Sequence, residues 1–307
     1  MDDLPEQDSF EARFDWLKAH AHSGSDRSLL DQIRADRSLV LTTGSLPPDE
    51  WLPPLRVQGL RVRLPRRSAP ASLDSLTEHL RDRVHARAAG FTAEDAGVVV
   101  DVGANEGIYA ACRFAENASL RMILVEPVPR TFSVLIETLL RNRSVSSPGG
   151  ESSFAAVRGL AGDLPCVRQA GSDLLEYSPQ VSTIASRSLT SKGPRWAKSL
   201  ATATLRCPVI SIDMLCGAHG VEDIDVLKVD AEGDELQVLA GSRQILRRTR
   251  RVVVEFHGRR NAAGCRNLLE SSGFRIVHVD ESPVGDMYAV SQLQDGDKDI
   301  ADRRADK

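Results

Sequence analysis

Val98-Val99-Val100-Asp101-Val102-Gly103-Ala104-Asn105-Glu106-Gly107 is an apolar strand that delivers an acid and then turns into a helix. Glycines at 103 and 107 permit a sharp turn and a close approach of the backbone to a ligand, which side chains would prevent. The pattern lacks the second and third glycines of G-x-G-x-x-G, which argues against a pyrophosphate bound at the start of the helix. Asp101 and Asn105 instead offer an acceptor and an amide that suit a zwitterionic amino-acid moiety. A strand–turn–helix junction without a ligand is the alternative.

Two further acids follow neighbouring strands. The strand Arg121–Glu126 ends in Glu126-Pro127, nineteen residues after Gly107. An acid at this position is placed to accept hydrogen bonds from two ribose hydroxyls. Any cofactor with a free ribose satisfies this pattern, nicotinamide dinucleotides included. After the next strand, Ala155–Leu160, Asp163 is placed to bind an adenine amine, although Gly-Asp is also an ordinary turn.

Short β-branched runs that alternate with helical stretches indicate a parallel sheet with crossover helices. The remaining strands are expected at Ile224–Val229, Arg251–Phe256, Phe274–Val279 and Met287–Gln292. The last two are joined by only seven residues, too few for a helical crossover, so they should form an antiparallel hairpin. A dinucleotide-binding sheet is parallel throughout, so this ending argues against an NAD-dependent oxidoreductase.

The region before residue 96 predicts small elements that cover the sheet domain. Apolar spacing indicates helices over Ser9–His22 and Asp26–Ala35, and alternation around Gly59 indicates a hairpin in Val57–Leu64. Ser75-Leu76-Thr77-Glu78 reads as the capping box of a helix that continues to about Ala89. Because this region shows no acid, base and glycine constellation, residues 1–95 are expected to be accessory. Residues 294–307 are expected to form a polar tail.

Composition excludes several classes of protein. The 307 residues carry a net charge of -4, with 41% hydrophobic and 27% charged residues, which is typical of a soluble globular chain. The apolar runs are a few residues long, whereas a membrane helix needs about 20, so no membrane partner is expected. The acidic amino terminus favours a cytoplasmic protein. The mildly acidic balance disfavours nucleic acid as a partner, and a homo-oligomer stays open.

The densest charge cluster lies at the end of the strand Ile224–Val229. Lys228 precedes the strand end and shares a face with Asp230, so we expect it to be buried beside a carboxylate partner. Asp230 and Glu232 follow the strand, where open α/β sheets place their substrate crevice. His257, after the next strand, is either a general base or a simple loop residue. No H-x-x-H or similar ligand set marks a metal, and none is expected.

Five motifs together resemble the FkbM family of S-adenosylmethionine-dependent methyltransferases. They are D-V-G-A-N-E-G at 101–107, V-E-P at 125–127, S-I-D-M-L at 211–215, L-K-V-D-A-E-G-D-E at 227–235 and V-V-V-E-F-H at 252–257. The resemblance covers about residues 96–292. It implies the α/β class I (Rossmann-like) methyltransferase fold, with a seven-stranded, mostly parallel sheet that ends in an antiparallel hairpin, here preceded by an α-rich extension.

The resemblance also implies a cofactor and a reaction. S-adenosyl-L-methionine would be bound through its methionine and ribose part by Asp101, Gly103, Asn105 and Gly107, and through its ribose hydroxyls by Glu126. Such enzymes are mostly O-methyltransferases of sugars and secondary metabolites, although carboxyl and other acceptors occur. The acceptor is thus expected to be a small molecule of open identity. A non-catalytic member that keeps the fold as a binding module is the further alternative.

A neutral hydroxyl acceptor must lose its proton, and the candidate bases are Asp230, Glu232 and His257, in that order. A carboxylate acceptor would need no base. The extension before residue 96 and an insertion at about 162–221 are both expected to cover the acceptor site, and Ser182–Leu189 with Trp196 is a candidate wall.

Overall fold

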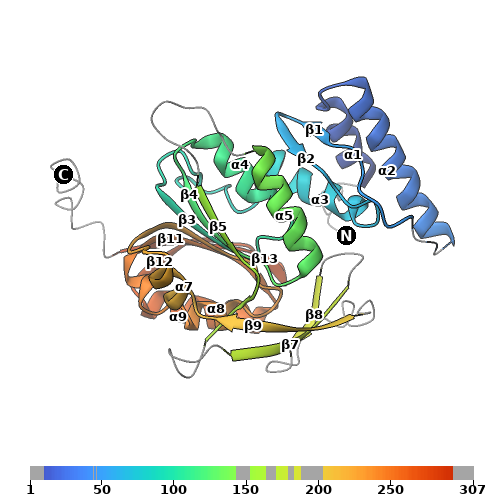
Figure 1. The fold of residues 1–307 in the computed structure, drawn as a ribbon. Coiled ribbons are helices and arrows are strands. Elements are labelled where there is room, and N and C mark those ends of the chain that lie inside the picture. Colours follow the sequence, from blue (N-terminus) through green and yellow to red (C-terminus); the bar gives the residue numbers. More distant parts are fainter. Residues whose placement is uncertain are drawn as a thin grey trace, which may run out of the picture.

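A seven-stranded sheet forms the centre of the computed structural model, with the strand order β12-β13-β11-β10-β3-β4-β5 (Figure 1). The strands are β3 (Val98–Val102), β4 (Arg121–Val125), β5 (Ser153–Val157), β10 (Ile224–Val229), β11 (Thr249–His257), β12 (Phe274–Val279) and β13 (Val284–Ser291). Strands β3, β4, β5, β10 and β11 are parallel, and β13 lies antiparallel between β11 and β12. The predicted sheet, including its closing hairpin, is therefore confirmed.

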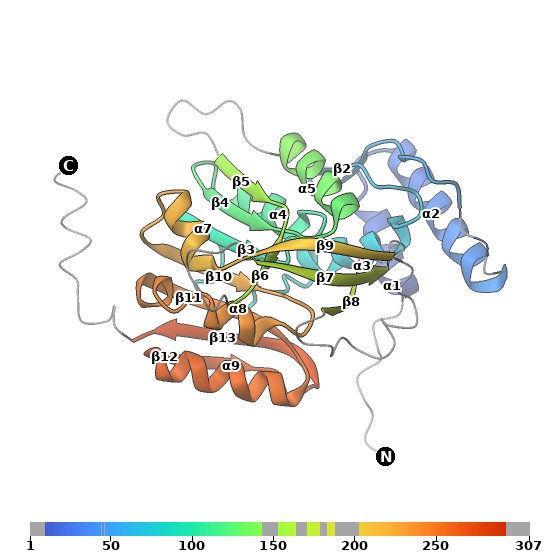
Figure 2. The same cartoon turned by 60° about the horizontal axis from the view of Figure 1, so that its bottom comes forward.

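The structure describes residues 10–43, 45, 47–142, 153–163, 171–178, 183–187 and 203–292, and it gives the backbone alone for 171–178, 183–187 and 203–206. Helices cover both faces of the central sheet. Successive residues of a strand point to opposite faces, so neighbouring residues pack against different helices. On one face, Val99 and Met122 pack against α4 (Ile108–Glu116) and α5 (Pro129–Asn142). On the other face, Val100 and Ile123 pack in a cluster with α7 (Ile212–Ala218), α8 (Glu235–Ala240) and α9 (Arg259–Ser271). Figure 2 shows α5 and α9 on opposite sides of the sheet.

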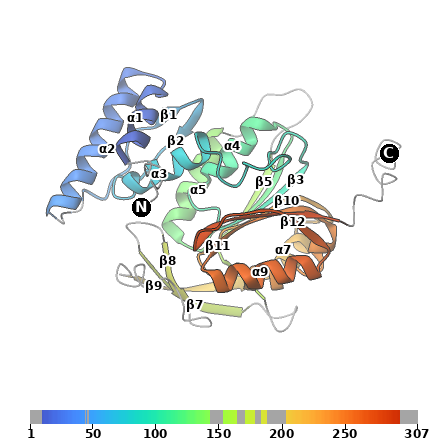
Figure 3. The same cartoon turned by 180° about the vertical axis from the view of Figure 1, so that it is seen from behind.

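The region before β3 contains the predicted helices and hairpin. They are α1 (Phe10–Ala19), α2 (Gly24–Thr43), β1 (Leu55–Val57), β2 (Leu60–Val62) and α3 (Ala69–Leu80). Phe14, Leu30 and Leu76 share one apolar cluster with Ile108 of α4 and Val134 of α5. Figure 3 shows these blue and cyan elements beside α4 and α5. The extension therefore packs onto the sheet domain through a common core. None of the helices that the structure describes is long and apolar enough to cross a membrane.

Helix α3 differs from its prediction at both ends. It starts at Ala69, with Pro70 in its first turn, so Ser75 lies inside the helix and is no N-cap. It stops at Leu80 although the apolar spacing continues to Val84. Arg83 and His85 have φ of 53° and 64°, a left-handed conformation that no helix accommodates. The backbone N–H of His85 instead donates to Asp286 of β13.

Two other predicted elements are split. The strand expected at Ala155–Leu160 breaks at Gly159 into β5 and β6 (Leu160–Ala161). The apolar spacing of Leu236, Leu239 and Ile245 predicts one amphipathic helix, but α8 ends at Ala240 and a 3-10 turn η1 (Ile245–Arg248) follows. Gly241, after the helix, lies against the backbone of Gly162.

Part of the predicted insertion forms a second sheet of order β6-β9-β7-β8. Its further strands are β7 (Gly171–Ser178), β8 (Thr183–Arg187) and β9 (Ala203–Ile210). The candidate wall at Ser182–Leu189 is described only as the backbone of β8, and Trp196 lies outside the described residues. The acceptor role expected for this segment therefore stays a prediction.

Candidate active site

The glycine turn after β3 brings three strand ends into contact. Gly103 has φ +75°, and its N–H donates to the carbonyl of Val125 at 3.0 Å. A Cβ at this position would lie 1.7 Å from the carbonyl oxygen of Asp230, so only glycine fits. The N–H of Asp230 in turn donates to the carbonyl of Val102 at 3.0 Å. The backbone thus fixes the end of β10 against the turn.

A cavity opens where β3, β4 and β10 end, and we call it the strand-end cavity. It is lined by Val102, Gly103, Asn105, Val125, Glu126, Pro127, Gly159, Leu160, Ala161, Asp230, Ala231, Glu232 and Asp234. Three of the predicted cofactor-binding residues, Gly103, Asn105 and Glu126, are among them. The predicted ligand crevice at the carboxyl edge of the sheet is therefore present as a cavity.

Glu126 is the most constrained acid of the strand-end cavity. Its side chain is 5% exposed and accepts hydrogen bonds from the backbone N–H of Val128 at 2.8 Å and of Asn105 at 3.1 Å. Burial raises the pKa of this carboxyl to about 8, although the two amides act in the opposite direction. Each carboxylate oxygen retains a second lone pair, so Glu126 is able to accept two further hydrogen bonds from a diol.

The other predicted cofactor-binding residues lie outside the strand-end cavity. Asp101 is 0% exposed, and its Oδ1 lies 3.0 Å from Nζ of Lys228. Gly107 is the N-cap of α4, where a Cβ would lie 2.6 Å from Cδ1 of Leu135. Asp163 is exposed at the surface. These three residues therefore do not line the strand-end cavity, and their contacts with a cofactor stay a prediction.

Lys228 is buried beside carboxylates, as the sequence predicts. Nζ lies 3.0 Å from Asp101 Oδ1 and 3.6 Å from Asp230 Oδ2, and it donates to the carbonyl of Gly103 at 3.1 Å. Burial alone would lower the pKa of this amine, but the two aspartates outweigh it and raise the pKa. Lys228 therefore stays charged and ties the ends of β3 and β10 together.

A second and larger cavity lies between α3, the start of α4 and the strand ends, and we call it the α3 cavity. Its volume is about 430 Å³. It is lined by Ser68, Ala71, Ser72, Asp74, Ser75, Glu78, His79, His85, Gly103, Ala104, Asn105, Glu106, Ile108, Tyr109, Lys228, Asp230, Glu232 and Glu255. Gly103, Asn105, Asp230 and Glu232 also line the strand-end cavity. The two cavities thus meet at the end of β10.

Asp230 and Glu232 are the acids at this junction. The Asp230 side chain is 25% exposed, and burial together with the neighbouring Glu255 raises its pKa, while Lys228 lowers it. Glu232 sits in a left-handed turn with φ +51°. Burial, followed by the charge of Asp230, raises its pKa to about 7. Both predicted acids are therefore placed where a proton would be accepted from a ligand in either cavity.

His257 differs from the general base that the sequence suggested. It lines neither cavity, and its Nδ1 lies 2.9 Å from Oε1 of the fully buried Glu235. Burial opposes a charged imidazole, but Glu235, Asp230 and Glu232 outweigh it and raise the pKa to about 10. An imidazolium at neutral pH cannot accept a proton, so His257 is better placed to hold the turn after β10 than to act as a base.

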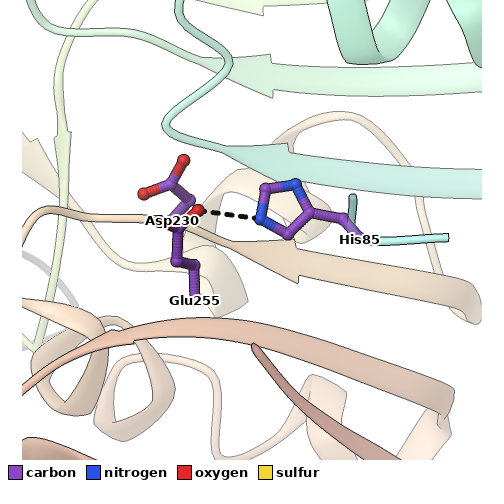
Figure 4. A group of neighbouring side chains, drawn as sticks. All are labelled: His85, Asp230 and Glu255. Atoms are coloured by element: carbon purple, nitrogen blue, oxygen red, sulfur yellow. Dashed lines mark hydrogen bonds and ion pairs between the residues drawn. The ribbon is translucent and has the colours of Figure 1, made fainter. Parts of the chain in front are cut away.

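Sequence reasoning missed two side chains that lie next to Asp230. Nε2 of His85 lies 3.0 Å from Oε2 of Glu255, and both face Asp230 (Figure 4). No sequence pattern marked His85 as a site residue, because its segment was expected to be helical. The sequence did mark Glu255, since an acid inside the apolar run V-V-V-E-F-H needs a buried partner.

Comparisons with known proteins place the chain in a family. Residues 101–276, more than half of the chain, match the family described as the methyltransferase FkbM domain. The chain belongs to the methyltransferase FkbM domain family. The seven-stranded sheet of this FkbM-domain protein, with its closing hairpin, is the class I methyltransferase fold that the resemblance implied.

The similar proteins range from a curated relative to solved structures. The "AMB antimetabolite synthetase AmbE" of Pseudomonas aeruginosa is 25% identical over 222 residues, which is 64% of this chain but only 10% of that relative. An O-methyltransferase family protein from Burkholderia thailandensis has a TM-score of 0.39 and 10% identity over 88% of this chain and 71% of its own. Magnesium protoporphyrin IX methyltransferase from Synechocystis, solved with S-adenosylmethionine bound, has a TM-score of 0.36 and 12% identity over 85% and 98%.

Proposed function

We propose that this FkbM-domain protein is an S-adenosylmethionine-dependent methyltransferase that methylates a hydroxyl oxygen of a small molecule such as a secondary metabolite or a sugar. The observation that carries the proposal is the meeting of the two cavities at Asp230. One cavity offers a diol-binding acid and the other offers room for an acceptor. A group that passes from one ligand to the other would cross at this junction.

The residues of the strand-end cavity fit the cofactor. Glu126 has lone pairs left for two ribose hydroxyls, and the turn at Gly103 leaves backbone within reach of a ligand. S-adenosylmethionine, when bound, supplies a methyl group on a positively charged sulfur. The enclosed volume of the cavity is about 60 Å³, so it would hold only part of the cofactor in this conformation. Asp101 acts indirectly, by fixing Lys228 under the turn.

The α3 cavity favours a neutral, hydroxylated acceptor. Among its lining residues, six carry carboxyl groups, three are serines, and Lys228 is the one residue with an amine. Like charges would repel a carboxylate acceptor, whereas hydroxyls are able to donate to the acids and exchange hydrogen bonds with the serines. Asp230 would accept the proton that such a hydroxyl loses, and Glu232 is the next acid in reach.

Calorimetry with S-adenosylhomocysteine tests the cofactor part of the proposal. We expect Glu126→Ala to weaken binding by about 10- to 100-fold, because each hydrogen bond to a charged group contributes roughly 1.5–3 kcal/mol. Glu270→Ala, on the exposed surface of α9, is the matched control and should bind like the wild type. Tighter binding of NAD than of S-adenosylhomocysteine would overturn the assignment.

Turnover on a panel of polyols and of carboxylic acids tests the acceptor part. Asp230→Asn should leave affinity for S-adenosylhomocysteine within a few-fold but cut turnover of a hydroxyl acceptor by about 10²–10⁴, the usual contribution of proton transfer. His257→Gln should cost less, because His257 lies outside both cavities. Methylation of carboxylic acids alone would contradict the hydroxyl assignment.

A further inference from the structure

His85, Asp230 and Glu255 bring one imidazole and two carboxylates to one wall of the α3 cavity. One ligating atom of each residue lies within 4.8 Å of those of the other two (Figure 4). The three come from distant parts of the chain: the irregular segment after α3, the end of β10 and the middle of β11. Tertiary packing, not local sequence, therefore assembles the group.

We propose that these three side chains form a binding site for a divalent transition-metal ion such as Mn²⁺ or Zn²⁺. Ligands of such an ion lie about 2.0–2.2 Å from it, which puts neighbouring ligand atoms about 3–3.5 Å apart. Nε2 of His85 and Oε2 of Glu255 already lie at 3.0 Å. The ligand atom of Asp230 lies within 4.8 Å of both, so it would have to move closer to complete a three-ligand face. Imidazole with carboxylates favours transition metals over Mg²⁺ or Ca²⁺, which prefer oxygen ligands alone.

The charge distribution around the three residues favours a cation. Glu78 of α3 and Asp286 of β13 add to the two carboxylates, and His85 Nε2 lies 3.4 Å from Asp286 Oδ1. Lys228 is the amine that faces this group among the described cavity residues, and it is closer to Asp101 than to Asp230. Partly buried carboxylates without a matching positive charge repel one another, and a divalent ion removes that cost.

A separate observation points to a ligand in the same place. Tyr109 of α4 lines the α3 cavity and is 2% exposed, yet its hydroxyl has no hydrogen-bond partner among the described residues. Its ring lies edge-on to His85, with centroids 6.1 Å apart. A buried hydroxyl without a partner is costly, so a further polar group is expected beside this wall of the α3 cavity.

The site would position the acceptor of the proposed reaction. With the ion held by these three side chains, an acceptor hydroxyl in the α3 cavity could bind to it and become more acidic. Asp230 would then hold the ion, and Glu232, the next acid in reach, would accept the proton. The ion would thus join the extension before β3 to the chemistry, because His85 comes from that extension. This role depends on the proposed function, but metal binding itself does not.

Metal binding by the full-length chain tests the site without cofactor or acceptor. After treatment with EDTA and desalting, the protein is titrated with Mn²⁺, and free Mn²⁺ is measured by electron paramagnetic resonance. We expect one tightly bound ion per chain and at least about a tenfold loss of affinity in His85→Gln. His79→Gln changes the same residue type in the same cavity outside the group, and it should bind within a few-fold of the wild type.

A second variant and a second probe guard against a folding defect. Glu255→Gln should lose Mn²⁺ as His85→Gln does, while thermal unfolding shows that the variants are folded. Co²⁺ should give an absorption spectrum typical of mixed nitrogen and oxygen ligands in the wild type alone. Absence of a bound ion, or equal binding by folded His85→Gln and wild type, would overturn the site. Because no cofactor is present, either result leaves the S-adenosylhomocysteine test independent.

Discussion

The strand-end cavity and the α3 cavity share the end of β10, but the chain builds them in different ways. The first is made mostly of residues at or just after the ends of strands of the central sheet, so a strand pattern and a glycine turn are enough to place most of them. The second takes much of its wall from α3 and from His85, which belong to the extension before the sheet. The proposed cofactor residues thus belong to local motifs, whereas the proposed acceptor residues depend on how two distant segments pack.

The largest effect is expected at Gly103, where the two cavities are held together. Gly103→Ala should destabilise the fold by about 3–5 kcal/mol, because its Cβ would overlap the carbonyl of Asp230 and the positive φ adds strain. Urea unfolding measures the loss. Gly217→Ala in α7 is the control, since nothing lies within 4 Å of a Cβ there, and it should be neutral or stabilising. Equal stability of both variants would mean that the turn does not fix β10.

The residues at the edge of the sheet could be predicted because short sequence patterns mark them. These patterns are the apolar runs, the turn glycine and the acids at strand ends. They predicted five residues that all line a cavity, namely Gly103, Asn105, Glu126, Asp230 and Glu232. Asp101 does not line that cavity, because a strand pattern gives the face on which a residue lies but not the depth at which it pairs with Lys228, and its contact with a cofactor stays a prediction.

The α3 side could not be predicted by the same rules. Helical spacing from Leu76 to Val84 concealed the break that lets the backbone of His85 meet Asp286. In the sequence Tyr109 looks like a core residue, and Glu255 signals only that an acid in an apolar strand needs a partner. The packing of α3 beside them shows that both line a cavity. The charge of His257 depends on the buried Glu235, whose position only the folded turn fixes.

Glu106 belongs to the glycine motif after β3, but its side chain lines the α3 cavity. Its titration therefore tests how closely α3 packs against that motif. It is 5% exposed, with Oε1 3.4 Å from the hydroxyl of Ser68, and burial raises its pKa from 4.5 to about 7. The folded state therefore keeps a proton that the unfolded chain loses above pH 4.5. Stability should fall as the pH rises from 4.5 to 7, by up to about 3 kcal/mol from this group.

Glu106→Gln should remove this contribution, so its unfolding free energy should depend less on pH than that of the wild type between pH 5 and 7. Urea unfolding at several pH values measures the difference, with Glu270→Gln on the exposed surface as the control. If the unfolding free energy of the variant depends on pH as that of the wild type does, Glu106 is ionised in the folded protein. Ser68, Ser72 and Arg130 would then outweigh burial, and α3 would pack loosely over the motif.

The smallest effect is expected at Glu126 and concerns the strand-end cavity alone. With a pKa of about 8, its carboxyl is mostly protonated at pH 7 in the free protein, whereas ribose hydroxyls donate to the ionised form. Binding of S-adenosylhomocysteine should therefore release a proton, and affinity should rise about five-fold from pH 7 to pH 8, following the ionised fraction. Calorimetry in buffers of different ionisation enthalpy counts that proton. Glu126→Gln, which cannot ionise, should bind more weakly and lose this part of the pH dependence. If the variant keeps the pH dependence of the wild type, another group releases the proton, and Glu126 only accepts hydrogen bonds from the amides of Asn105 and Val128. The proposed cofactor cavity would then not be defined by the acid that the local motif predicts, and its contrast with the packing-dependent α3 cavity would be lost.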